Sequence, residues 1–186
     1  GKGNVAFHYH KVMKEKGYDV KMISSRKVFT LDDVESNIVI ISVKDDAIKE
    51  VLNKLPYVKS LLLHTSGFTN TDLLLQKADN VGCLYPLQSL NKKKDIDFSK
   101  VPLCLYVNNE AYKTSLEQFA QSLSSQTCFM TDDQRQYLHI AAVFANNFTN
   151  HLLGISKEIL DKHNIPFSLL YSIIDRTIEN IKTSDD

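Results

Sequence analysis

The chain has 186 residues and carries 22 basic and 22 acidic side chains, so its formal net charge is zero. This balance excludes the long-range field that draws a protein to nucleic acid or to an anionic membrane, and any anion site has to be local. The longest apolar runs, such as 38–41 and 61–63, are strand-sized and far too short to cross a bilayer.

Helices and strands are predicted to alternate over the first two thirds of the chain. The apolar positions of 4–16 fit a helix, and Gly17 ends it. Strands are expected at 18–23, 37–43, 60–64, 81–84, 103–107 and 127–130, and helices at 45–55, 69–77 and 110–123. This alternation predicts an α/β fold over residues 1–130, with a Rossmann-type, doubly wound and mostly parallel sheet.

The remaining third, 131–186, is predicted to be all-helical. Asp132 or Asp133 can cap a long helix that runs to about His163, and Pro166 begins another that runs to about Lys182. We therefore expect a helical second domain directly after the Rossmann-type domain.

Two parts of the Rossmann pattern are missing. Such a unit opens with a buried strand that feeds the glycine turn, and nothing precedes Gly1, so we expect the first strand to be absent. Only about ten residues separate Arg26 from the strand at Asn37, which is short for a crossover helix. Either residues are missing there or the crossover is abbreviated.

The opening residues match the G-x-G-x-x-G/A dinucleotide fingerprint. Small residues at its fixed positions let the backbone turn tightly and approach a pyrophosphate at the helix N-terminus. The alternative is a plain glycine turn, but the helix and the next strand follow at the required places. The candidate cofactor-binding residues here are Gly1, Gly3, Asn4, Val5 and Ala6.

The end of the next predicted strand favours NADP(H) over NAD(H). An NAD enzyme places Asp or Glu there for the ribose hydroxyls, whereas this chain has Ser24, Ser25 and Arg26. A guanidinium and two hydroxyls can bind a 2′-phosphate, which a carboxylate would repel. The alternative is that Arg26 is a solvated surface residue.

The ends of two further strands should also border the cofactor, because ligands of open α/β sheets sit outside the carboxyl ends of the strands. The alternatives are that Asp45 or Asp46 merely caps the following helix and that Ser66-Gly67 merely makes a turn. The candidate residues are Ser42, Val43, Lys44, Thr65, Ser66 and Gly67.

These motifs resemble, in their order, those of bacterial Rossmann-like NADP oxidoreductases with a helical C-terminal domain of unknown function. The resemblance is carried by 1–6, 24–26, 41–48, 64–67, 85–89 and especially LHIAAVFANNFTNH at 138–151. That family is similar to pyrroline-carboxylate reductases, deazaflavin-dependent NADP oxidoreductases and β-hydroxyacid dehydrogenases. The resemblance implies hydride transfer between NADP(H) and a small carbonyl, hydroxy or imine substrate. It also implies a helical domain that completes the active site and forms a homodimer, and a chain that continues beyond Asp186.

Candidate catalytic residues lie on the long predicted helix. His139 is suited to general acid or base chemistry, and Asn147 and Asn150 can hold a substrate oxygen. Spacings of three or four place on one face His139, Val143, Asn147 and either Asn150 or His151. Phe144, Phe148 and Leu152 can face the core. The alternative is a polar stripe bonded within the helical domain or at a dimer interface.

The resemblance also limits what can be carried over. β-Hydroxyacid dehydrogenases have a catalytic lysine four residues before the asparagine that corresponds to Asn147, and this chain has Val143 there. The segment that begins at Tyr85 should lie near the same cleft, with Gln88 or Ser89 free to hydrogen-bond, although Tyr85 also suits a core.

An NADP(H)-dependent oxidoreductase acting on a small molecule is therefore the first hypothesis, and an NADP(H)-binding sensor without turnover is the second. A methyltransferase on the same kind of sheet is a distant third. No membrane or nucleic-acid partner and no metal is expected. The three cysteines Cys83, Cys104 and Cys128 lack the spacing of a zinc site and fit reduced core thiols in a cytoplasmic protein.

Overall fold

The computed structural model describes residues 1–183, and the chain divides into two compact units at 1–140 and 141–186. The division falls inside a helix, so the residues from Asp132 to Ile140 belong with the sheet-containing unit. The described part of the second unit is helical.

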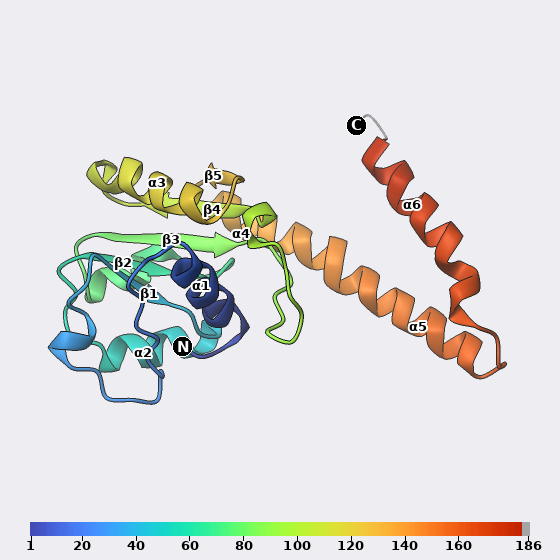
Figure 1. Cartoon of the computed structure of the whole chain (residues 1–186), viewed down its shortest axis with the longest axis horizontal. Coiled ribbons are helices and arrows are strands. Elements are labelled where there is room, and N and C mark those ends of the chain that lie inside the picture. The colour runs from blue at the N-terminus through green and yellow to red at the C-terminus, as the bar shows by residue number, and fades with distance from the viewer. Residues whose placement is uncertain (184–186) are drawn as a thin grey trace. The chain divides into compact units, whose positions relative to one another are not determined.

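The first unit is built on a five-stranded sheet whose strand order follows the sequence (Figure 1). Strands β1, β2 and β3 are parallel, β4 is antiparallel to β3, and β5 is parallel to β4. The predicted doubly wound, mostly parallel sheet is thus confirmed. The strands are β1 (Ile38–Ile41), β2 (Leu61–His64), β3 (Val81–Pro86), β4 (Leu103–Val107) and β5 (Thr127–Phe129).

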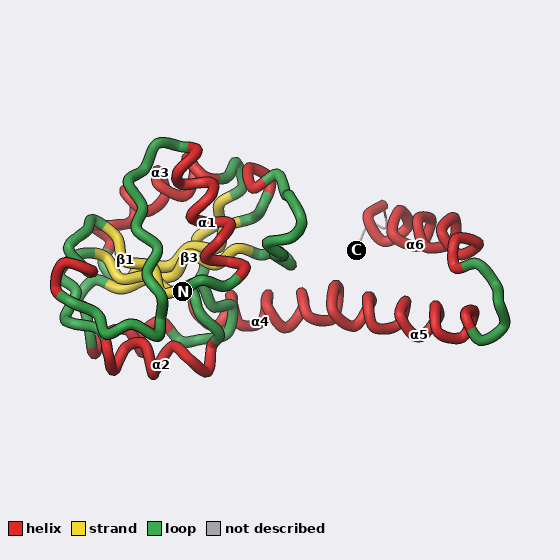
Figure 2. The backbone as a smooth tube through the Cα atoms, turned by 60° about the horizontal axis from the view of Figure 1, so that its bottom comes forward, coloured by secondary structure: helices red, strands yellow, loops and turns green. Residues whose placement is uncertain are grey.

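Helices cover both faces of this sheet, as Figure 2 shows. Helices α1 (Asn4–Glu15) and α3 (Lys113–Leu123) pack on the face that carries Leu61 and Leu63 of β2. Helix α2 (Asp45–Lys54) packs on the opposite face, against Leu62. Neighbouring side chains of a strand point to opposite faces, so the continuous Leu61–Leu63 run supplies both cores.

The strand predicted at 18–23 is wrong. This segment has no strand neighbour, because β1 forms the edge of the sheet and a cavity separates the two. After it, Leu31–Asp33 forms a single 3-10 turn, closed by a capping box between Thr30 and Asp33. The crossover between 26 and 37 is therefore abbreviated.

Two helix predictions and one burial prediction also need correction. The segment expected as a helix at 69–77 forms a 3-10 helix, Thr71–Gln76, and the residues Glu110–Tyr112 before α3 are likewise 3-10. Cys83 and Cys104 are buried, but Cys128 is exposed on the short edge strand β5 and is not a core thiol.

The long predicted helix begins with a cap other than the expected Asp132 or Asp133. Thr131 Oγ1 accepts a hydrogen bond from the Gln134 N–H at 3.2 Å, and the Thr131 N–H donates to Gln134 Oε1 at 2.9 Å. This reciprocal pair is a capping box, which leaves the Asp132 carboxylate free for other partners. Helix α4 (Asp132–Ala142) then leads into the second unit.

In the second unit, a π-helical segment (Val143–Phe148) continues into α5 (Thr149–Asp161). The predicted break is confirmed: Asn164 has φ 54°, Pro166 precedes a 3-10 turn (Phe167–Leu170), and α6 (Tyr171–Thr183) follows. No helix among residues 1–183 is long and apolar enough to cross a membrane.

None of the described residues of this unit is buried. Phe144, Phe148 and Leu152, which were expected to face a core, are 62%, 49% and 62% exposed. Phe144 and Phe148 instead stack on each other, with ring centroids 4.9 Å apart. The helical unit therefore presents its apolar side chains at the surface.

Candidate functional site

The candidate cofactor residues gather where the parallel strands β1, β2 and β3 end. Gly1 lies directly against the backbone that follows β1: a Cβ on Gly1 would lie 1.9 Å from the Ser42 carbonyl oxygen and 3.1 Å from Val43 Cγ1. Only glycine allows this approach, so the first position of the fingerprint brings the start of α1 against the carboxyl end of β1.

The N-terminus of α1 is open. Gly3 is its N-cap residue and supplies no side-chain cap, and no atom lies within 4 Å of the point where a Cβ would stand. The first turn carries no acidic residue. The helix thus presents uncapped backbone N–H groups and the positive end of its dipole, which together favour an anion.

Hydroxyl groups tie the ends of β1 and β2 together. Thr65 Oγ1 donates to Ser42 Oγ at 3.3 Å, and the Thr65 N–H donates to the Ile41 carbonyl oxygen at 3.2 Å. Ser66 Oγ accepts from the backbone N–H groups of Phe68 and Thr69 at 3.1 and 2.9 Å. The predicted Ser66-Gly67 turn is therefore real, and it is held in place beside the end of β1.

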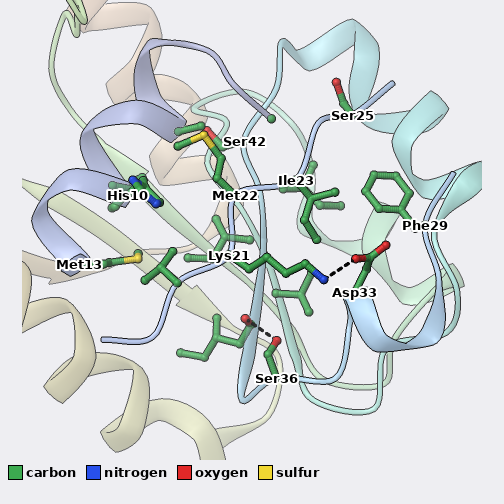
Figure 3. A pocket seen from close by; sticks show the side chains of 18 of the residues that line it. His10, Met13, Lys21, Met22, Ile23, Ser25, Phe29, Asp33, Ser36 and Ser42 are labelled. Atoms are coloured by element: carbon green, nitrogen blue, oxygen red, sulfur yellow. Dashed lines mark hydrogen bonds and ion pairs between the residues drawn. The ribbon is translucent and has the colours of Figure 1, made fainter. Parts of the chain in front are cut away.

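A cavity of about 460 Å³ runs along the outer edge of β1, from Asn37 to Val43 (Figure 3). Its walls come from both cores, with Met13 on one side and Leu55 on the other, so it lies in line with the sheet. Five of the candidate residues line it: Gly1, Ala6, Ser25, Ser42 and Val43. The structure therefore brings the glycine turn, the 24–26 segment and the end of β1 around one space.

Most of that cavity is a slot along the edge of β1. It separates an unpaired sheet edge from the Tyr18–Ile23 segment, and the apolar side chains of Val20, Ile38 and Ile40 are among those that line it. The end formed by Gly1 and Ser42 adjoins the open N-terminus of α1, whose backbone N–H groups suit a pyrophosphate. We therefore place the candidate phosphate site at this end and at the start of α1. The strand expected before Gly1 stays a prediction.

The segment expected to read the ribose forms a turn in which the Lys27 N–H donates to the Ser24 carbonyl oxygen at 3.1 Å. Arg26 is exposed at its tip, and within residues 1–183 its guanidinium forms no hydrogen bond or ion pair with another side chain. The nearby Asp33 carboxylate is held by Lys21 at 2.8 Å and Lys27 at 3.0 Å, which lower its pKa. Asp33 is thus already engaged, whereas Arg26 is free to meet an anion.

The candidate catalytic histidine lies at the same edge of the sheet. Tyr85 Oη, near the end of β3, is 2.9 Å from His139 Nδ1 on α4, and the two rings meet edge to face with centroids 5.8 Å apart. A Cβ on Gly67 would lie 2.6 Å from His139 Nδ1 and 2.8 Å from Tyr85 Cζ. Burial raises the pKa of Tyr85 to about 12, so its hydroxyl keeps its proton at neutral pH.

The remaining candidates lie elsewhere. Lys44 is the exposed N-cap residue of α2, and Asp45 and Asp46 occupy the first turn rather than the cap position. Asn147 and Asn150 belong to the second unit, where both bond to Asn146. Their predicted role in substrate binding stays a prediction. No three His, Cys, Asp or Glu side chains within 1–183 are grouped so as to hold a metal ion.

Sequence reasoning missed the partners that support this site. Tyr85 could not be separated from a core aromatic, and Thr71, Asp132 and Arg135 gave no local signal for the buried contacts that they form. The contacts of Thr71 with Asp132 and of Thr69 with Arg135 join residues 61 and 66 apart in the chain, so no spacing in the sequence could reveal them.

Comparisons with known proteins agree with this architecture. Residues 101–186 match the family model described as "Domain of unknown function (DUF2520)". No curated protein matches the sequence. A protein from Bacteroides fragilis, described as a "putative NADP oxidoreductase", has a similar crystal structure with a TM-score of 0.86 and 28% sequence identity. The alignment covers 100% of this chain and 79% of that one.

Two more distant structures share the fold. A Thermotoga maritima protein has a TM-score of 0.65 and 23% identity over 80% of this chain. Pyrroline carboxylate reductase from Plasmodium falciparum, solved with NADP bound, has a TM-score of 0.55 and 14% identity over 82% of this chain. This chain spans 60% of the length of each. The resemblance inferred from the motifs is thereby confirmed.

Proposed function

We propose that this protein is an NADP(H)-dependent oxidoreductase that acts on a small carbonyl, hydroxy or imine compound. The observation that carries the proposal is the placement of Gly1 against Ser42, which sets an open helix N-terminus at the carboxyl edge of a Rossmann-type sheet. The likeness to the Bacteroides fragilis protein supports the cofactor, since NADP is named in that protein's description.

The residues present fit the cofactor. The backbone N–H groups at the start of α1 would bind the pyrophosphate, and Gly3 leaves room for its close approach. Ser25 and the free guanidinium of Arg26 would bind a 2′-phosphate through charge-assisted hydrogen bonds. The cofactor, when bound, supplies the hydride chemistry, so the protein has to orient the substrate and manage a proton.

The Tyr85–His139 pair is the group that would manage that proton. The Tyr85 hydroxyl keeps its proton, and His139 Nδ1 lies within hydrogen-bond distance of it. A substrate oxygen or nitrogen that gains a proton could receive it from Tyr85, with His139 as the next group in line. Asn147 and Asn150 would hold the substrate.

The experiment is a titration of the protein with NADPH and NADH, followed by cofactor fluorescence. In the unaltered protein we expect tighter binding of NADPH. Arg26→Ala should weaken NADPH binding about tenfold or more, because it removes hydrogen bonds between charged groups. NADH binding should stay unchanged. Lys59→Ala is the matched control, since it removes one exposed positive charge away from the cavity.

Equal affinity for both nucleotides, unchanged by Arg26→Ala, would contradict the NADP(H) assignment. Turnover is tested separately with a panel of small keto, hydroxy and imino acids, followed by NADPH absorbance. Tight NADPH binding without turnover of any of them would favour a nucleotide-binding sensor, the function that Val143 at the position of the dehydrogenase lysine supports.

A further inference from the structure

A chain of buried polar side chains runs from the β2 end loop to helix α4. His64 Nδ1 accepts from the Ser66 N–H at 3.1 Å, and His64 Nε2 lies 3.1 Å from Thr71 Oγ1. Thr71 Oγ1 donates to Asp132 Oδ1 at 2.8 Å, and the Thr71 N–H donates to Asp132 Oδ2. His64 and Thr71 are both fully buried. We call Ser66, His64, Thr71, Asp132 and Arg135 the buried polar chain.

The hydrogen bonds of this chain have only one consistent direction. A backbone N–H can only donate, so His64 Nδ1 must be the unprotonated ring nitrogen and Nε2 must carry the proton. Nε2–H then donates to Thr71 Oγ1, whose own proton goes to the carboxylate of Asp132. Burial lowers the pKa of His64 to about 4, in agreement with a neutral ring. The buried polar chain therefore selects the Nε2–H tautomer of His64.

Arg135 is the last member of the buried polar chain and links Asp132 to the backbone of the 66–71 loop. Its side chain is 1% exposed and donates to Asp132 Oδ1 at 2.6 Å and to the Thr69 carbonyl oxygen. A buried ion pair returns little net stability, because desolvation of both charges offsets their attraction. Fixing the position of α4 against the 66–71 loop accounts better for the presence of this pair.

That position matters because His139 lies one turn further along α4. Residues four apart share a helix face, so Arg135 and His139 both point at the 64–71 segment. Ser66 at the start of the chain is followed by Gly67, on which the His139 ring rests. The buried polar chain thus fixes both helix α4, which carries His139, and the Ser66-Gly67 turn, on which the His139 ring rests.

We propose that Thr71, Asp132 and Arg135 are positioning residues, which set His139 against Tyr85 and hold the Ser66-Gly67 turn at the cofactor edge. This inference rests on the proposed function for the catalytic role of that pair. The position of His139 against Tyr85 does not depend on a bound cofactor, so it can be tested separately from NADPH binding.

The test is Thr71→Val, which keeps the shape of the side chain and removes its hydroxyl. In the full chain without cofactor, nitrogen NMR should show the Nε2–H tautomer of His64 in the unaltered protein. The valine should shift the ring signals of His139, which Thr71 does not touch. The NADPH dissociation constant should rise about three- to thirtyfold, the range for changes that act through a coupled network.

Two further variants separate positioning from simple loss of stability. Thr71→Ser keeps the hydroxyl and should restore the His139 signals and the NADPH affinity. Ser124→Ala removes another buried hydroxyl, which donates to the Ser99 and Val101 carbonyl oxygens at 3.1 and 2.7 Å rather than to the buried polar chain. It should lower stability similarly and leave both signals unchanged.

The inference is overturned if His64 carries its proton on Nδ1, or if Thr71→Val and Ser124→Ala affect His139 alike. Failure of the unaltered protein to bind NADPH would instead count against the proposed function. In that case the NMR measurements would still decide whether the buried polar chain positions His139. Should Thr71→Val fail to fold, Asp132→Asn, which keeps the shape but removes the charge, gives the same test.

Discussion

Gly67 is the residue of the candidate site on which the Tyr85 and His139 rings both rest. A Cβ there would lie 2.6 Å from His139 Nδ1, 2.7 Å from His139 Cγ and 2.8 Å from Tyr85 Cζ. We therefore expect Gly67→Ala to push the two rings apart and to break their hydrogen bond. The crowding should lower the free energy of unfolding by about 1–3 kcal/mol, measured by urea denaturation.

Gly154→Ala is the matched control for this substitution. Gly154 lies on α5 with nothing within 4 Å of its missing Cβ, so alanine should be neutral or stabilise the helix by up to about 1 kcal/mol. If Gly67→Ala were as harmless as Gly154→Ala, the rings could not rest on Gly67 as described.

His64 should give the protein a pH dependence of stability. Burial disfavours the charged form of its ring, so its pKa falls from the ordinary 6.5 of an exposed histidine to about 4 in the folded protein. The unfolded chain therefore binds the extra proton first as pH falls. The stability contributed by the neutral ring is complete above about pH 6.5, and roughly 3 kcal/mol is lost between there and pH 4.

Urea unfolding at several pH values checks this expectation. The chain has six histidines, so the relevant quantity is the difference between the unaltered protein and His64→Gln, which cannot titrate. The variant should show a flatter pH dependence between pH 4 and 6.5. Equal slopes for the two proteins would mean that His64 is not held neutral by burial.

At the level of residues, the sequence predicted what depends on local geometry. Gly1 and Ser42 could be expected at the site because a glycine turn and a strand end have fixed places in a parallel sheet. The Thr71–Asp132 contact could not, because it joins residues 61 apart in the chain. The prediction of Asp132 as a helix cap was wrong for the same reason. Its position before a helix suggested a cap, whereas its carboxylate binds Thr71, which is distant in the sequence.

At the level of elements, the strand predictions were correct for segments that have a neighbouring strand to pair with. The apolar runs of β1 and β2 pair with each other and became strands. Tyr18–Ile23 has strand-like residues, with the charged Asp19 and Lys21 between apolar ones, but a strand also needs a neighbour for its backbone hydrogen bonds. Here the slot along β1 separates it from the sheet edge.

The π-helical segment shows another limit of pattern reading. Predicting one helix face through His139, Val143 and Asn147 assumes a constant 3.6 residues per turn. The wider turn at Val143–Phe148 breaks that period, and nothing in the residue types announces it. Such segments often occur at functional sites, which agrees with the predicted substrate-binding role of Asn147.

On the scale of the whole molecule, the two units differ in how they bury apolar side chains. The first has a core on each face of its sheet, whereas none of the described residues from 141 onward is buried. Leu152, Ile155 and Ile159 recur at helical spacing on α5, and all three are exposed. Exposed apolar stripes of this kind mark surfaces that a partner covers.

We propose that a second copy of the chain covers this stripe, as in the homodimer expected from the sequence. Light scattering after size-exclusion chromatography should then give twice the mass of one chain. Ile155→Glu should yield a monomer, because it would bury an unpaired charge at the interface. Glu158→Gln, an exposed change on the same helix, should leave the dimer intact. A single-chain mass for the unaltered protein at micromolar concentration would contradict the proposal, and the stripe would then need a different partner.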